Sequence, residues 1–217
     1  MITNAEKNHK SVLIRDELNG EIFNERYFTK DYSFDFVPDA EGDWAEFMTD
    51  DACYFYINGD YVRFWYITPD GVKGYYDKCN LFEYSGEDKV FAPGESKVVW
   101  TWRGVRFRPA ICYDLRFPVF MHNEGDYDVL LISANFPDSR LLAWDTLVRA
   151  RAIENMCYVA ASNRVGVDEY GTYKGHSVII APYGNILAAC PDGEQGSATV
   201  GLDDEMLAKM RVMHALL

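Results

Sequence analysis

Apolar and aromatic residues alternate with polar ones in short runs through the second quarter of the chain, and turn signals separate these runs. Residues 54–57 and 61–67 flank Asn58-Gly59, the strongest short signal for a β-hairpin. Pro69-Asp70-Gly71 marks another turn, before a run at residues 72–76. The pattern predicts three consecutive strands joined by tight turns.

The rest of the chain mixes strand-length runs with two helical segments. Residues 97–111 predict two strands around Arg103-Gly104. Further strands are expected at residues 129–134, 158–165, 177–181, 186–190 and 198–202. Residues 140–155 have the amphipathic pattern of a helix, with apolar positions at Leu141, Trp144, Leu147, Val148 and Ile153. Asp203 is placed to cap a last helix that runs to Met213. This order of elements favours an α/β protein with stacked sheets and helices outside them.

Composition fits a single domain over residues 1–217, because 48% of the 217 residues are hydrophobic and the chain is long enough to bury a core. The formal net charge is −13, from 21 basic and 34 acidic residues. This balance argues against nucleic acid or an anionic membrane as a partner. It still allows an anionic small substrate, because one or two local arginines can hold a carboxylate.

The cysteines and histidines show neither disulfide nor metal-ligand spacing. There is no CxxC motif, and the cysteines lie at positions 53, 79, 112, 157 and 190. We therefore expect reduced thiols, no metal site and no cofactor. The sequence has no apolar run long enough to span a membrane, and its first ten residues are too polar for a signal peptide. These features predict a cytoplasmic protein.

Cys112 is the candidate for chemistry. It follows a β-branched and aromatic run at residues 100–111, and Pro118 suits the first turn of a helix shortly after it. A side chain at such a strand-to-helix turn stands clear of the sheet edge, and the N–H groups after it can receive an oxyanion. Cys112 is therefore a candidate nucleophile. The alternative is a buried core cysteine, which is what a lone cysteine more often is.

The segment Arg108-Pro-Ala-Ile-Cys112-Tyr-Asp-Leu-Arg-Phe-Pro118 resembles the nucleophile region of the nitrilase, or carbon–nitrogen hydrolase, superfamily, and its form is most similar to the bacterial ω-amidase branch. Other motifs of the family follow in the same order over roughly residues 60–203. They are Tyr76-Asp-Lys-Cys-Asn-Leu-Phe82, Gly86-Glu87, Phe91-Ala-Pro-Gly94, Ala134-Asn-Phe-Pro137, Arg149-Ala-Arg-Ala-Ile-Glu-Asn155, Ser162-Asn-Arg-Val-Gly166 and Tyr173-Lys-Gly-His-Ser177. A single motif of this kind is weak evidence, but a series in one order is specific.

The resemblance implies a four-layer α-β-β-α sandwich, incomplete at its amino-terminal end, and a homodimer or larger assembly. It also implies a Glu-Lys-Cys triad with Cys112 as nucleophile and Lys78 as the lysine. Glu87 matches a second glutamate that positions the lysine and the substrate. The backbone N–H of Tyr113 is the expected oxyanion donor, and Asn135 with Phe136 would contact substrate. Taken alone, Lys78 would be a surface lysine, Glu87 a loop carboxylate and Phe136 a core residue.

The general base is the poorly matched member of the triad. An ungapped alignment places Arg26 where relatives have the catalytic glutamate, and Glu25 stands one residue away without the usual preceding proline. We expect Glu25 to face Cys112, because a one-residue shift at a strand end exchanges the two faces. The amino-terminal quarter is divergent or shortened in comparison with relatives, so the chain is either a shortened member or part of a longer protein.

Two functions from different classes follow. The first is a thiol amidohydrolase that releases ammonia from a small ω-amide, such as 2-oxoglutaramate or 2-oxosuccinamate, through a thioester on Cys112. The second is a non-catalytic relative, a binding or assembly protein that has lost its base. A third and weaker possibility is an acyl-transferring or nitrile-hydrolysing relative.

Other charged residues near these motifs have more than one interpretation. Arg116 would either pair with Asp114 or shape the site entrance. On the amphipathic helix, we expect Arg149, Arg151 and Glu154 to form a buried ion-pair network.

Overall fold

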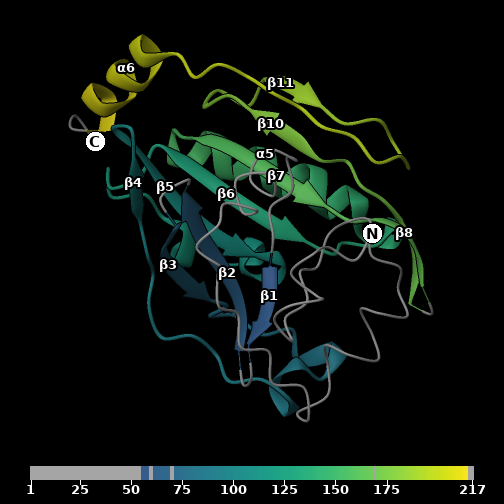
Figure 1. Ribbon diagram of the computed structural model, residues 1–217. Coiled ribbons are helices and arrows are strands. Elements are labelled where there is room, and N and C mark those ends of the chain that lie inside the picture. The colour runs from purple at the N-terminus through teal and green to yellow at the C-terminus, as the bar shows by residue number, and fades with distance from the viewer. Residues whose placement is uncertain (1–54, 59–60, 69–70, 169, 215–217) are drawn as a thin grey trace.

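The computed structural model describes residues 55–58, 61–68, 71–168 and 170–214, which form two sheets and a separate hairpin (Figure 1). Strands β1 (Phe55–Asn58), β2 (Tyr61–Thr68) and β3 (Gly71–Asp77) make a three-stranded antiparallel sheet in chain order. The three strands predicted from the alternating pattern are thus confirmed within a residue or two at their ends, while residues 59–60 and 69–70 of the predicted turns lie outside the described residues.

The larger sheet has six strands in the order β11-β10-β7-β6-β5-β4. They are β4 (Trp100–Trp102), β5 (Val105–Ile111), β6 (Val129–Ala134), β7 (Tyr158–Asn163), β10 (Val178–Ile180) and β11 (Ile186–Ala189). The central strands β5, β6 and β7 run parallel, so their carboxyl ends meet at one edge of the sheet. Cys112 and Asn135 come directly after two of these strand ends. The outlying hairpin consists of β8 (Val165–Asp168) and β9 (Gly171–Lys174).

The two faces of the six-stranded sheet carry separate cores. On β6, Leu130 and Ile132 pack with Trp144 of helix α5 (Leu141–Asn155). Val129 lies on the opposite face, packed with Leu207 of helix α6 (Asp204–His214). This alternation follows from the two-residue period of side chains along a strand.

Trp100 on the edge strand β4 packs against the small sheet. The Trp100 ring stacks on Tyr66 with centroids 4.8 Å apart and lies 5.9 Å from Phe64. A Cβ at Gly74 would come within 2.9 Å of Trp100 Nε1, so the close approach of β3 to this ring requires glycine. The small sheet is therefore packed against the large one, and Lys78 at its end is held near the carboxyl end of β5.

Three sequence predictions about elements are wrong in detail. Residues 198–202 follow the edge strand β11 but form no strand, because they make no ladder of backbone hydrogen bonds with a described strand. The expected strand at 158–165 ends at Asn163, because the chain leaves the sheet there and pairs with β9. Ile153 was assigned to the apolar face of α5, but it is 50% exposed. The cap at Asp203 is confirmed, since its carboxylate accepts the N–H of Met206 at 3.0 Å.

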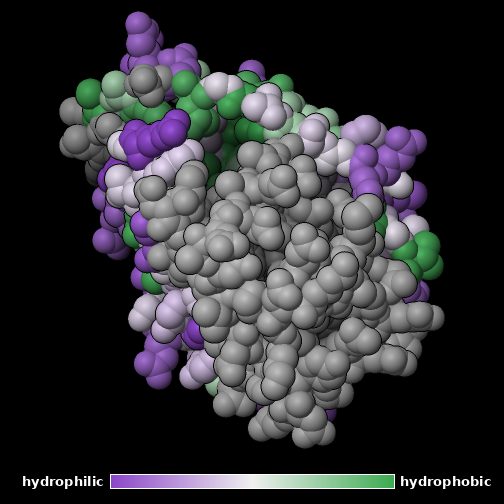
Figure 2. Space-filling view, viewed as in Figure 1, coloured by the Kyte–Doolittle hydropathy of each residue, from purple (hydrophilic) through white to green (hydrophobic). Residues whose placement is uncertain are grey.

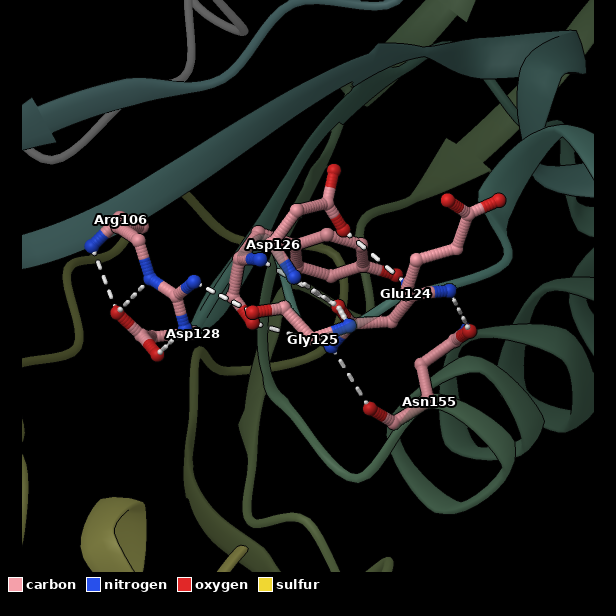
Figure 3. Close-up of polar contacts among 8 residues, drawn as sticks. Arg106, Glu124, Gly125, Asp126, Asp128 and Asn155 are labelled. Atoms are coloured by element: carbon pink, nitrogen blue, oxygen red, sulfur yellow. Dashed lines mark hydrogen bonds and ion pairs between the residues drawn. The ribbon is translucent and has the colours of Figure 1, made fainter. Parts of the chain in front are cut away.

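The amino ends of β5 and β6 are tied together by a polar network around the 123–128 loop (Figure 3). Asp128 accepts the backbone N–H of Arg106 at 2.8 Å and pairs with its guanidinium, also at 2.8 Å. The Asn123 amide donates to the Asn155 and Tyr127 carbonyls at 3.0 Å. These bonds fix the loop that leads from helix α4 (Pro118–Met121) back into the sheet.

Apolar side chains gather at the upper edge of the molecule, around α6 and β11 (Figure 2). The exposed ones there are Ile186, Leu187, Val212 and Met213. Within the described ranges, no helix has both the length and the apolar character that crossing a membrane demands.

Candidate active site

Cys112 lies at a sharp turn between β5 and α4. It begins the short 3-10 helix Cys112–Arg116, and Pro118 then occupies the first position of α4. Its φ is 47°, in the left-handed region that a residue with a Cβ seldom adopts. Its sulfur accepts the backbone N–H of Asn135, which follows β6. The turn therefore lifts the thiol off the end of the strand and holds it against the neighbouring strand end.

Lys78 follows β3 and is 1% exposed, so it is not a solvated surface lysine. Its backbone is fixed on both sides, since its N–H donates to the Val62 carbonyl and its carbonyl accepts the Gly94 N–H, each at 2.8 Å. The ammonium donates to Glu87 Oε2 at 2.5 Å. The lysine is therefore held as a buried cation.

Glu87 belongs to the short 3-10 helix Glu87–Lys89 and is 9% exposed. The same oxygen that accepts from Lys78 also accepts the Phe82 N–H at 2.8 Å. Glu87 is thus a fixed, buried carboxylate that orients the lysine, and not a solvated loop residue.

The charges of the site act on the protonation of the thiol and the lysine. Burial raises the pKa of the Cys112 thiol above its ordinary value; Lys78 opposes this rise, while Glu87 and Asp114 add to it. Burial disfavours the charged form of Lys78, but Glu87, Cys112 and Asp114 outweigh it, and the pKa of the lysine is raised. At neutral pH the arrangement therefore holds a thiol beside an ammonium, and a base is needed to make the thiolate.

Asp114 is a buried carboxylate that sequence reasoning did not assign to the site. It is 0% exposed and accepts four hydrogen bonds, from Tyr76 Oη, Ile111 N, Asn80 N and Asn80 Nδ2. Burial raises its pKa, and these donors oppose the rise. Of the two alternatives for Arg116, pairing with Asp114 is not found, because amide and hydroxyl donors occupy both oxygens of that carboxylate. The Asp within the Cys112 motif was visible in the sequence, but nothing local showed which donors would reach it.

The residues expected to contact substrate lie around Cys112 in different ways. The Tyr113 ring packs against Phe82, with centroids 4.9 Å apart. Among described residues, the side-chain Nδ2 of Asn135 is buried and has no hydrogen-bond partner. The Phe136 ring lies in the core beside Trp144, with centroids 5.3 Å apart, and its backbone is bonded on both sides to the Asn163 amide. Asn163, which was not singled out from the sequence, therefore fixes the segment that carries Asn135.

An open surface pocket of about 440 Å³ lies at the start of α5. It is lined by Arg116, Ser139, Arg140, Leu142, Ala143, Thr146 and Leu147. The Arg140 guanidinium lies 4.7 Å from the centre of the Phe82 ring. With the described residues, neither Arg116 nor Arg140 makes an ion pair or a side-chain hydrogen bond, whereas Arg63, Arg106, Arg151 and Arg164 each pair with a carboxylate.

The expected ion-pair network on α5 is only partly present. Arg151 pairs with Glu154 at 2.6 Å and also donates to the Leu115 carbonyl, next to Asp114. Arg149 is exposed and bonds instead to the Gly184 carbonyl, so it does not belong to the network.

The expected base and its competitor cannot be placed beside these groups. Glu25 and Arg26 both lie outside the described residues. Within the ranges that the structure covers, no cluster of three or more His, Cys, Asp or Glu side chains is arranged to hold a metal ion.

Comparisons with known proteins identify the family of the chain. A family model described as carbon–nitrogen hydrolase matches residues 5–212. The chain is 44% identical to "Omega-amidase YafV" of Yersinia enterocolitica over 155 residues, 71% of this chain and 60% of the relative. It is 38% identical to "2-oxoglutaramate amidase" of Bacillus subtilis over 138 residues, 63% of this chain and 53% of the relative.

A solved structure with the same fold is XC1258 from Xanthomonas campestris, described as a CN-hydrolase superfamily protein with an arsenic adduct in its active site. The TM-score is 0.67 at 40% identity, and the match covers 70% of this chain and 61% of that one. The chain thus spans between half and two thirds of the length of these relatives.

Proposed function

Because the chain belongs to the carbon–nitrogen hydrolase family, we propose that it is a thiol-dependent amidohydrolase that converts a small ω-amide to the acid and ammonia. The substrate would be of the 2-oxoglutaramate or 2-oxosuccinamate type. The observation that carries the proposal is the buried Lys78–Glu87 pair, whose charges act directly on Cys112. The ω-amidase and 2-oxoglutaramate amidase relatives support the choice of substrate class.

In the first half-reaction a base removes the Cys112 proton, and the sulfur adds to the amide carbon. The oxyanion that forms accepts from the Tyr113 backbone N–H and the Lys78 ammonium. The protonated base then gives its proton to the nitrogen, the C–N bond breaks, and ammonia leaves a thioester on Cys112. In the second half, the base takes a proton from water, the hydroxyl adds to the thioester carbon, the C–S bond breaks to release the acid, and the base returns its proton to the Cys112 sulfur.

Each remaining residue has a proposed part in this cycle. Glu25 is the proposed base. Glu87 keeps the Lys78 ammonium aimed at the oxyanion. The unpaired Asn135 amide offers a donor to a substrate oxygen. Phe136 would act from the core, by shaping the floor of the site beside Asn135.

The surface pocket lined by Arg116 and Arg140 supports the proposal that the substrate carries a carboxylate. In a chain of net charge −13, these two guanidinium groups have no carboxylate partner among the described residues. Arg140 contacts Phe82, which contacts Tyr113, and Tyr113 follows the nucleophile. A guanidinium there can hold the carboxylate of an ω-amide acid whose amide carbon lies at Cys112.

The second candidate, a non-catalytic binding or assembly protein, follows from the alignment that places Arg26 at the position of the base. Arginine stays protonated and cannot return a proton to the leaving nitrogen. The two proposed functions involve the same fold and the same turn at Cys112, but only the amidohydrolase would turn over an amide substrate.

Ammonia release from 2-oxoglutaramate tests the proposal. Wild-type protein should release ammonia, and Cys112→Ala should release none. Cys157→Ala, which changes a buried cysteine directly before β7, should retain turnover. Glu25→Gln should lose turnover while Cys112 still reacts with iodoacetamide. If the wild-type protein releases no ammonia from any ω-amide, the non-catalytic function is correct.

A further inference from the structure

Asp114 joins the two segments that carry Lys78 and Cys112. Its Oδ2 accepts the Tyr76 hydroxyl at 2.7 Å and the Ile111 N–H at 2.9 Å. Its Oδ1 accepts both the N–H and the side-chain amide of Asn80, at 3.0 and 2.8 Å. Three of these bonds connect the Lys78 segment to the Cys112 segment, and the bond from Ile111 lies within the Cys112 segment. Every acceptor position of a fully buried carboxylate is therefore used.

Residues of this hydrogen-bond network lie before and after each of the two reacting residues in the chain. Tyr76 and Asn80 flank Lys78, and the Tyr76 oxygen also accepts the Cys79 N–H at 3.1 Å. Ile111 and Asp114 itself flank Cys112. The carboxylate thus fixes the backbone immediately before and after the lysine with respect to the backbone around the nucleophile.

We propose that Asp114 is a positioning residue that sets the distance and direction between the Lys78 ammonium and the Cys112 sulfur. Its role deepens the proposed function, because it matters for turnover only if these two groups act together on an amide. The carboxylate acts through Lys78 and Cys112 and does not itself touch substrate.

The backbone of the nucleophile explains why a clamp is needed. Cys112 adopts a positive φ of 47°, and such a conformation persists only where surrounding bonds over-determine it. The bond from the Ile111 N–H to Asp114 closes this turn from the residue before the cysteine. Without it, the turn can relax toward ordinary helical or extended backbone, which would move the sulfur away from Lys78.

Asp128 supplies a matched control. It is a second buried carboxylate, 2% exposed, and it also accepts a backbone N–H and side-chain donors between distant segments. It lies at the amino ends of β5 and β6, whereas Asp114 follows the carboxyl end of β5. An effect of general loosening should appear in both variants.

The test compares Asp114→Asn with Asp128→Asn by kcat and KM for 2-oxoglutaramate, melting temperature and the pH dependence of Cys112 alkylation by iodoacetamide. An asparagine at 114 directs an N–H₂ group at existing donors, so half of the clamp is lost. We expect kcat to fall about 100-fold in Asp114→Asn with KM changed only a few-fold, because small misplacements of reacting groups have effects of this size. We expect Asp128→Asn to lower the melting temperature and leave kcat within twofold of wild type.

The alkylation measurement reports on the site without turnover. Loss of the clamp should raise the pH midpoint of Cys112 alkylation, because a sulfur that has moved away from Lys78 loses the charge that favours its thiolate, and this effect is larger than the removal of the Asp114 charge. The midpoint should not move in Asp128→Asn. A thiolate that forms less easily, together with slower turnover, is the signature of lost positioning.

The outcomes separate the two proposals. The role of Asp114 is wrong if kcat of Asp114→Asn stays within twofold of wild type, or if Asp128→Asn lowers kcat equally. If Asp114→Asn does not fold, Tyr76→Phe removes one clamp bond and should still lower kcat about tenfold; an unchanged kcat contradicts the role. If wild-type protein has no turnover, the proposed function fails, and an unmoved alkylation midpoint in Asp114→Asn then contradicts the clamp separately.

Discussion

The two ends of the parallel strands β5 and β6 carry buried polar networks of different kinds. At the amino ends, Arg106, Asp128, Asn123 and Asn155 join neighbouring loops (Figure 3). There the charges form a direct arginine–carboxylate pair, and amides satisfy the backbone. At the carboxyl ends, one lysine, two carboxylates and a thiol share a buried volume, and the pKa values of Cys112, Lys78 and Asp114 are all raised.

The difference separates a network that holds the fold from one that is prepared for chemistry. The Arg106–Asp128 pair leaves no group free for a ligand. The cluster at the carboxyl ends instead brings together a thiol, an ammonium and the Asn135 amide, which has no partner among the described residues. Displaced pKa values with a specific charge partner are typical of functional sites. Equivalent substitutions at the two ends should therefore affect different quantities: turnover at one end and stability at the other.

The largest effect is expected for Lys78→Arg. Arginine keeps the charge, but its planar head is larger than an ammonium and cannot occupy the same enclosed position against Glu87. Turnover of 2-oxoglutaramate should fall by at least about 100-fold, the range found when one oxyanion donor is removed. Near-normal steady-state ammonia release would show that Lys78 is not part of the triad.

A smaller effect is expected for Arg140→Ala. The loss of a guanidinium that holds the substrate carboxylate should raise KM for 2-oxoglutaramate about tenfold, a loss of about 1.4 kcal/mol. Steady-state kinetics with a neutral linear amide provides the control, and its KM should not change. An equal rise for both substrates would mean that Arg140 only supports the packing around Phe82.

The pH dependence of Cys112 alkylation should show its displaced pKa. Since burial raises that pKa, the iodoacetamide rate should rise with pH through a midpoint above about 8.5, the ordinary value for cysteine. Lys78→Met removes the charge that favours the thiolate, so its midpoint should lie higher still. A midpoint below that of an exposed cysteine in the wild-type protein would contradict the described electrostatics.

The smallest effect on turnover is expected for Arg106→Lys at the opposite end. A lysine cannot form the forked contact with Asp128, so unfolding in urea should show a loss of about 1–2 kcal/mol. Turnover per folded molecule should remain unchanged. A loss of turnover similar to that of Lys78→Arg would remove the distinction between the two networks.

Local pattern was enough to predict most of the fold. The Asn58-Gly59 and Pro69-Asp70-Gly71 signals located the small sheet, and apolar runs located β5, β6 and α5 within a few residues. The prediction for residues 198–202 was wrong because strand propensity does not reveal whether a segment forms backbone hydrogen bonds with a neighbouring strand. Ile153 was misassigned because helical spacing alone does not fix where the buried face of α5 ends.

The site was less accessible to sequence reasoning. Motif resemblance singled out Cys112, Lys78 and Glu87, which the structure brings to one place. Asp114 and Asn163 were missed, because their importance depends on donors 27 to 38 residues away in the chain. Such long-range pairing depends on how β3, β5 and β6 are arranged and has no local pattern.

The central claim is that Cys112 carries the acyl group during turnover. Mass spectrometry of the intact and digested protein, quenched within the first turnovers after an ω-amide pulse, tests it directly. The account predicts an acyl adduct on Cys112 that disappears as ammonia and acid accumulate, and none on Cys79 or Cys157. An adduct on either of those cysteines, with Cys112 unmodified, would contradict it.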